Sequence, residues 1–244
     1  MCSSDLGLHP LTRAKLTLNR AVALQEQVGD AEAIRAWDEA VAAYRSATWA
    51  GHPALSRALL KRGEFSLWKQ DSEAAARDFR AALPGLESDA ASHTGSLRSA
   101  HTGLALAAVV RLRVDEAARE VEAALALGGE DDPLLASVGC EARLVAGAPR
   151  EARLFATREV ELLREADDAM AAARAEVHLG EVLMYLGDAP AARAQLEAAL
   201  QHFAELGGAA TQDTAYARKA LGLLALRGRD EAAAEAALTG ALAL

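Results

Sequence analysis

The 244-residue sequence is poor in the residues that build β-sheets and disulfide-stabilised folds. Aromatic residues make up only 4% of the chain, which argues against a β-sandwich or barrel, because strands are rich in aromatic and β-branched side chains. The two cysteines, Cys2 and Cys140, have no CxxC spacing and cannot form a disulfide framework, so a reducing cytoplasm fits best. No apolar run reaches the roughly 20 residues that span a bilayer, so we expect no membrane interaction.

Sequence motifs of the common catalytic and metal-binding sites are also missing. There is no phosphate loop, no Gly-x-Ser-x-Gly elbow and no His-Glu-x-x-His. His93 and His101 would share one helix face if that helix starts early, but no third ligand lies nearby. We interpret Cys140 as a small packing residue rather than a nucleophile. The sequence therefore predicts no enzyme activity, no catalytic residue, no metal site and no cofactor.

The negative charge is concentrated in the second half of the chain. The formal net charge is −9; residues 1–122 carry 15 basic and 16 acidic groups, and residues 123–244 carry 11 and 19. Because an acidic surface repels phosphate backbones, we expect no nucleic-acid binding. Basic peptides or cationic ligands match the second half better.

Alanine is the residue that the sequence has in excess, at 61 of 244 positions. Alanine is the strongest helix former, and an apolar content of 52% excludes a disordered chain. The alanines recur in a repeat anchored at Ala33, Ala75, Ala117, Ala152, Ala192 and Ala234, with intervals of 42, 42, 35, 40 and 42 residues. Twelve residues before each anchor stands a small residue: Ala21, Gly63, Ala105, Cys140, Gly180 and Gly222.

Each repeat is predicted to be a helix, a tight turn and a second helix, with the small residue at the crossing. The residue four positions after the anchor, such as Phe79 or Leu196, is expected to fill the gap beside it. The fourth repeat fits least well, with Ala156 at the large position and Glu159 at a small one. The expected helices are 11–28, 31–48, 53–70, 72–87, 95–112, 114–127, 132–146, 149–166, 169–187, 189–206, 210–227 and 230–243.

This pattern resembles the tetratricopeptide repeat (TPR) family over residues 14–244. One of the best-matching repeats runs from Leu179 to Leu200, with Gly180, Ala192, Leu196 and Ala199 at the family's positions. The basic repeat has 34 residues, whereas most intervals here are 40–42, a lengthening similar to that in bacterial signal-responsive regulators and kinesin-type light chains. The resemblance implies an all-α, right-handed superhelical α-solenoid of about six TPR-like units, forming a single repeat domain over residues 11–244.

Residues 1–10 are predicted to be non-native or disordered. Met1-Cys2-Ser3-Ser4-Asp5-Leu6 looks like a translated sequencing adapter, which would make this a bacterial, metagenomic fragment of a larger protein. A native polar segment is the alternative. The chain also ends in Ala241-Leu242-Ala243-Leu244 without a capping helix, which solenoids normally need.

The resemblance also implies a concave groove lined by the first helix of each repeat. Projection from the small residues predicts a ligand-binding set of apolar and acidic side chains: Leu60, Glu64, Trp68, Glu141, Glu181, Met184 and Tyr185. We therefore predict a non-catalytic scaffold that binds a protein or a peptide, with basic partners favoured. Alternatively, Trp68 and Tyr185 simply pack between lengthened helices, or the chain is the sensor region of a larger bacterial transcriptional regulator or ATPase. The apolar last helix, with Leu238, Leu242 and Leu244, predicts a homodimer contact.

Overall fold

The computed structural model describes residues 9–27, 30–207 and 211–242, and the regular structure within these ranges is entirely α-helical. This confirms the predicted all-α fold class. Of the segment predicted to be non-native or disordered, residues 1–8 lie outside the described residues.

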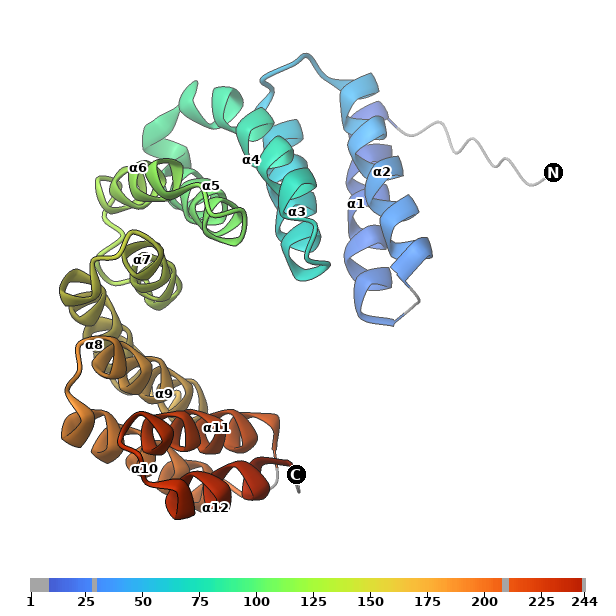
Figure 1. Ribbon diagram of the computed structural model, residues 1–244. Helices are drawn as coiled ribbons and strands as arrows, with labels where there is room; N and C mark the ends of the chain where they lie inside the picture. The colour runs from blue at the N-terminus through green and yellow to red at the C-terminus, as the bar shows by residue number, and fades with distance from the viewer. Residues whose placement is uncertain (1–8, 28–29, 208–210, 243–244) are drawn as a thin grey trace. The chain divides into compact units, whose positions relative to one another are not determined.

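The helices belong to two compact units, Met1–Gly128 (the N-terminal unit) and Gly129–Leu244 (the C-terminal unit) (Figure 1). The N-terminal unit contains α1 (Pro10–Gln27), α2 (Asp30–Ala47), α3 (Pro53–Trp68), α4 (Ser72–Glu87), α5 (Ala90–Val110) and α6 (Val114–Leu125). The C-terminal unit contains α7 (Pro133–Val145), α8 (Pro149–Glu165), α9 (Ala169–Tyr185), α10 (Ala189–Glu205), α11 (Gln212–Arg227) and α12 (Glu231–Leu242). Successive helices pack as pairs, three in each unit, as the repeat predicts.

The turn inside a helix pair has the same backbone geometry in each of the five pairs whose turn lies within the described residues. One residue adopts a positive φ: Gln70 (62°), Leu112 (53°), Gly147 (71°), Gly187 (79°) and Arg229 (58°). The next residue donates its N–H to the carbonyl five residues earlier, as from Asp71 to Ser66 at 2.9 Å, which is the Schellman closure of a helix. Where that residue is aspartate, its carboxylate caps the second helix, as Asp188 does by accepting from the Ala191 N–H at 3.2 Å. A repeated turn and cap thus close most pairs.

The helix crossings depend on glycines that face a large side chain. A Cβ built on Gly63, Gly180 or Gly222 would lie 2.7 Å from Phe79, Leu196 or Leu238 respectively. This confirms the predicted pairing of small and large residues sixteen positions apart in three repeats. Any side chain at these glycines would overpack the crossing.

In the fourth repeat, the small and the large residue of the helix crossing each lie one position earlier than predicted. Gly139 faces Phe155, with 2.5 Å from a built Cβ to the ring, instead of Cys140 facing a large residue at 156. Cys140 and Ala156 are buried in one cluster with Ala152 and Val182, where the larger cysteine compensates for the smaller alanine. The fourth repeat therefore keeps the pairing of a small with a large residue but places the large side chain one position earlier.

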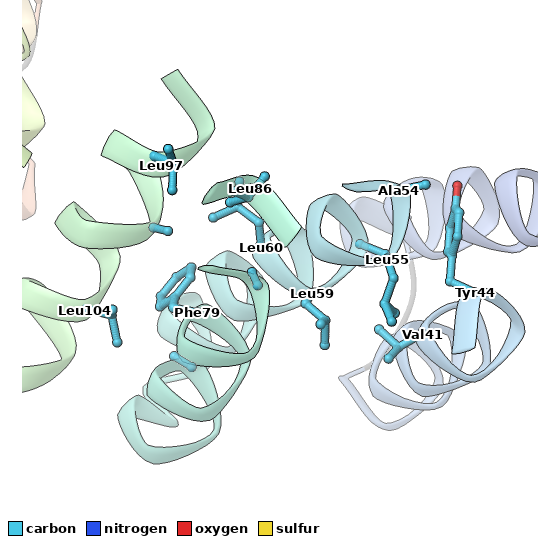
Figure 2. Packing of buried hydrophobic residues seen from close by; sticks show 14 of the residues in the cluster. Val41, Tyr44, Ala54, Leu55, Leu59, Leu60, Phe79, Leu86, Leu97 and Leu104 are labelled. Carbon is cyan, nitrogen blue, oxygen red and sulfur yellow. The ribbon is translucent and has the colours of Figure 1, made fainter. Parts of the chain in front are cut away.

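Phe79 is the central side chain of the N-terminal core. It is fully buried, and its ring lies against Gly63 of α3 and Gly103 of α5. Figure 2 shows it among the buried leucines of α3, α4 and α5, including Leu60, Leu86 and Leu104. One ring thereby joins three helices.

Helix α5 begins at Ala90, five residues earlier than expected, because Asp89 caps it by accepting from the Ser92 N–H at 3.4 Å. The early start places a break in helical geometry at His93, where φ is −122° and ψ is 16°. The sequence signals for this start are weak, since the first turn is Ala-Ala-Ser-His rather than an apolar repeat.

Candidate functional site

The N-terminal unit has an aromatic-walled cavity between its first three helices. The cavity has a volume of about 610 Å³ and is lined by Val22, Gln25, Trp37, Lys61, Glu64, Phe65 and Trp68. The rings form a row, with centroids 6.0 Å apart from Trp37 to Phe65 and 5.9 Å apart from Phe65 to Trp68. Trp37 is buried at 1% exposure, whereas Trp68 at 63% is open to a partner.

Charges around this cavity already have partners within the unit. Lys61 Nζ donates to Glu64 Oε2 at 2.7 Å, one helical turn away on α3. Lys69 Nζ lies 3.7 Å from the centroid of the Trp68 ring, a cation–π contact. The cavity therefore offers apolar surface with largely offset charge.

The C-terminal unit gathers charged and phenolic groups of a different kind. We call Glu141 of α7, Glu159 of α8, His178 and Glu181 of α9, and Tyr216 of α11 the acidic cluster. His178 Nδ1 lies 3.7 Å from Glu159 Oε2, and the Tyr216 hydroxyl donates to Glu181 Oε2 at 3.2 Å. Glu159 is buried, His178 and Glu181 are half-buried, and Glu141 is open to solvent. Three helices thus contribute one carboxylate each around one imidazole, and α11 adds a phenol.

The ionisation of these groups is coupled through their charges. The nearby Glu159 carboxylate raises the pKa of His178 above its ordinary value, against the opposite effect of burial, and Glu181 and Glu141 add to the increase. Although Glu141 is exposed, the surrounding protein removes part of its hydration and raises its pKa. The His178 charge lowers this pKa, and repulsion from Glu159 and Glu181 raises it. Desolvation and then the Glu181 charge raise the pKa of Tyr216 to about 12. Carboxylates contribute to all three increases, and for His178 a carboxylate is the largest cause.

The buried Cys140 thiol belongs to the same neighbourhood. Desolvation raises its pKa to about 12, with further contributions from Glu159, Glu141 and Glu181. A thiol with this pKa stays protonated at neutral pH and is a poor nucleophile. This agrees with the interpretation of Cys140 as a packing residue.

Exposed aromatic surface borders the acidic cluster. Tyr185 is 64% exposed and Tyr216 is 42% exposed. The Arg227 guanidinium lies 5.8 Å from the Tyr185 ring, and its Nη1 donates to the Met184 carbonyl at 3.1 Å. Arg227 is thus engaged with α9 beside the cluster.

The seven predicted binding residues separate into surface and core positions. Glu64 and Trp68 line the N-terminal cavity, Glu141 and Glu181 belong to the acidic cluster, and Tyr185 is exposed on α9. Leu60 at 5% and Met184 at 9% exposure lie in the hydrophobic cores instead. The sequence projection missed Glu159, His178 and Tyr216. Of these three residues, only Glu159 gives a signal in the sequence, because it is a carboxylate at a position where the repeat expects a small residue.

The described residues contain no group of three or more His, Cys, Asp or Glu side chains placed to hold a metal ion. None of the helices in these ranges is both long and apolar enough to cross a membrane. On the last helix Leu242 is 89% exposed, while Leu244 lies outside the described ranges, and the dimer contact stays a prediction.

The fold is similar to that of solved helical-repeat proteins, although no protein-family model and no curated protein sequence matches the chain. BtubC (BKLC) from P. vanneervenii matches with a TM-score of 0.63 and 19% identity, over 98% of this chain and 90% of that one. A putative kinesin light chain from Podosopora anserina, with nearly identical TPR-like repeats, matches with a TM-score of 0.64 and 17% identity, over 82% of this chain and 98% of that one. With the six helix pairs described above, the chain has the fold of TPR-like helical-repeat proteins.

Proposed function

We propose that this protein is a non-catalytic scaffold of the cytoplasm that binds a protein or peptide segment carrying basic residues. The observation that carries the proposal is the acidic cluster of the C-terminal unit. Its Glu141 carboxylate is exposed and forms no hydrogen bond or ion pair with any side chain in the described part of the chain. A concentrated negative charge of this kind attracts cationic side chains and raises their association rate.

Aromatic side chains supply the apolar part of the proposed interaction. Tyr185 and Tyr216 stand beside the carboxylates, and tyrosine offers a large contact area with little entropy to lose on binding. An arginine or lysine side chain can stack on such rings while its charge meets Glu141 and Glu181. The exposed Trp68 of the N-terminal unit is a second anchor for an apolar side chain of a bound segment.

Selection from a phage-displayed library of random peptides tests this function. We expect the selected peptides to be enriched in arginine and lysine, and to lose about tenfold in affinity for the Glu141→Gln/Glu181→Gln variant, since two partly exposed charge pairs contribute about 1–2 kcal/mol together. Binding should weaken further as salt is added, because the attraction is screened.

The matched control is Glu197→Gln/Glu235→Gln, which removes the same charge from exposed positions of α10 and α12. This variant should keep its affinity within about twofold. Selected peptides without basic residues, or equal losses in both double variants, would contradict the proposed acidic binding surface.

A further inference from the structure

His178 is the imidazole that faces the acidic cluster, and charged or titratable groups approach it from several packed elements. Glu141 comes from α7, Glu159 from α8, Glu181 from its own helix, and Tyr216 from α11. His178 and Tyr216 also line a cavity of about 270 Å³ with Arg174, Val177, Phe203, Gln212 and Asp213. The imidazole is therefore half-buried at the edge of an open space, not sealed inside the core.

The other cation at this cavity is already neutralised. Arg174 donates from Nε to Asp213 Oδ2 at 2.9 Å, and its Nη2 lies 2.8 Å from the same oxygen. The α10 residue of the lining, Phe203, is apolar. Protonated His178 is consequently the group whose positive charge offsets Glu141, Glu159 and Glu181.

The two protonation states of His178 present different surfaces to a partner. As imidazolium, it neutralises one of the three carboxylates and repels an incoming guanidinium or ammonium group. As neutral imidazole, it leaves three negative charges without an internal cation and can still accept a hydrogen bond. We propose that His178 is a resident counter-cation whose deprotonation opens the acidic cluster to a basic side chain of the partner, so that binding is controlled by pH. This inference rests on the proposed function and adds its regulation.

The sign of the pH dependence follows from linkage. A basic side chain bound at the carboxylates disfavours the imidazolium and lowers the pKa of His178, so binding releases a proton. Affinity must therefore rise as pH increases through the raised pKa of the free protein and level off above it. Arginine itself keeps its charge at every pH used, so a change over this range comes from the protein.

Fluorescence anisotropy with a fluorescein-labelled hepta-arginine amide tests the inference at constant ionic strength between about pH 6 and pH 8.5. We expect the wild-type affinity to increase about tenfold over this range, as His178 loses its proton. In His178→Gln the affinity should vary by less than about twofold and should match the high-pH value of the wild type. His202→Gln is the matched control: His202 lies in the same unit but pairs with Glu176 at 2.7 Å, outside the cluster, so this variant should keep the wild-type pH dependence.

An NMR titration of the wild-type histidine resonances makes the test independent of how the variants fold. The pKa of the His178 imidazole should lie above the ordinary histidine value in the free protein and should fall when the arginine peptide is added.

The results of these measurements separate the inference from the proposed function. Tight binding with the same pH dependence in His178→Gln, or a His178 pKa unmoved by the peptide, overturns the role of His178 and leaves the basic-partner function standing. Failure of the wild type to bind the peptide better than Glu141→Gln/Glu181→Gln at any pH overturns both.

Discussion

The two units of the chain use one repeat design but present opposite kinds of surface. In the N-terminal unit Glu64 is bound by Lys61 at 2.7 Å beside a row of aromatic rings. In the C-terminal unit Glu141, which also follows the small residue of its repeat, has no ion pair among the described residues and meets further carboxylates. A lysine one turn earlier in α3, at a position that Val138 occupies in α7, makes the difference. The repeat thus determines where a side chain stands, while single neighbours determine its charge environment.

The packing of the two units differs in how many helices one large side chain joins. Phe79 lies against glycines of both α3 and α5, whereas Leu196 fills one crossing against Gly180. Phe79→Ala should therefore lower the free energy of unfolding of the N-terminal unit by about 3–5 kcal/mol, and Leu196→Ala should affect the C-terminal unit by about 2–5 kcal/mol. Hydrogen exchange read by mass spectrometry reports each unit separately. Loss of protection below about 1 kcal/mol in Phe79→Ala would contradict its place as a joint of three helices.

The turns inside the helix pairs provide a second contrast. The two that the structure describes in the N-terminal unit have Gln70 and Leu112 at positive φ, whereas two of the three in the C-terminal unit have glycine there. Leu112 has a φ of 53° and is 72% exposed, so Leu112→Gly relieves strain at little cost in buried surface. We expect it to stabilise the N-terminal unit by about 0.5–1 kcal/mol. Gly187→Ala, at a φ of 79°, should destabilise the C-terminal unit by about 1 kcal/mol. Urea denaturation of both variants checks the pair, and a stabilising Gly187→Ala would show that the turn geometry is wrong.

The smallest expected effect comes from making the charge environment of Glu64 in the N-terminal unit resemble that of Glu141 in the C-terminal unit. Lys61→Ala removes the partner of Glu64 and should strengthen binding of an arginine peptide to the N-terminal unit about threefold. Lys15→Ala removes an exposed lysine of α1 and corrects for the change in net charge. Equal gains in the two variants would mean that total charge, rather than a freed Glu64, sets the affinity.

The sequence predicts the fold well because the repeat is recognised from residue size. A small residue followed at a fixed interval by a large one indicates one arrangement, a close helix crossing. Glycine at 63, 180 or 222 with a large residue sixteen positions later indicates a close crossing, and the structure has these crossings. The expected helix bounds are correct at residues 72–87 and differ by about two residues at several ends, since turns close in similar ways with different residues. The exceptions are local: Asp89 starts α5 early, and Phe155 takes over the role expected at position 156.

The candidate site was harder to predict because it depends on contacts between helices. Leu60 was expected in the groove, but α3 packs against both α4 and α5, which covers that side chain. His178 and Tyr216 carry no sequence signal, since nothing in a periodic pattern states that they share a space with Glu181. Glu159 did carry one, as a carboxylate in a position reserved for small residues. A charged residue at a position where the repeat expects a small one is therefore a candidate member of a polar site.

Binding of basic segments to the acidic cluster of the C-terminal unit is the interaction on which the proposed function depends. Hydrogen exchange of the whole protein with and without the hepta-arginine amide at about pH 8.5 tests it, since the exchange pattern locates the bound peptide. We expect added protection in α7, α9 and α11, little change in α1 to α3, and loss of that protection in Glu141→Gln/Glu181→Gln. Protection confined to α1 to α3, or unchanged by the double substitution, would contradict it.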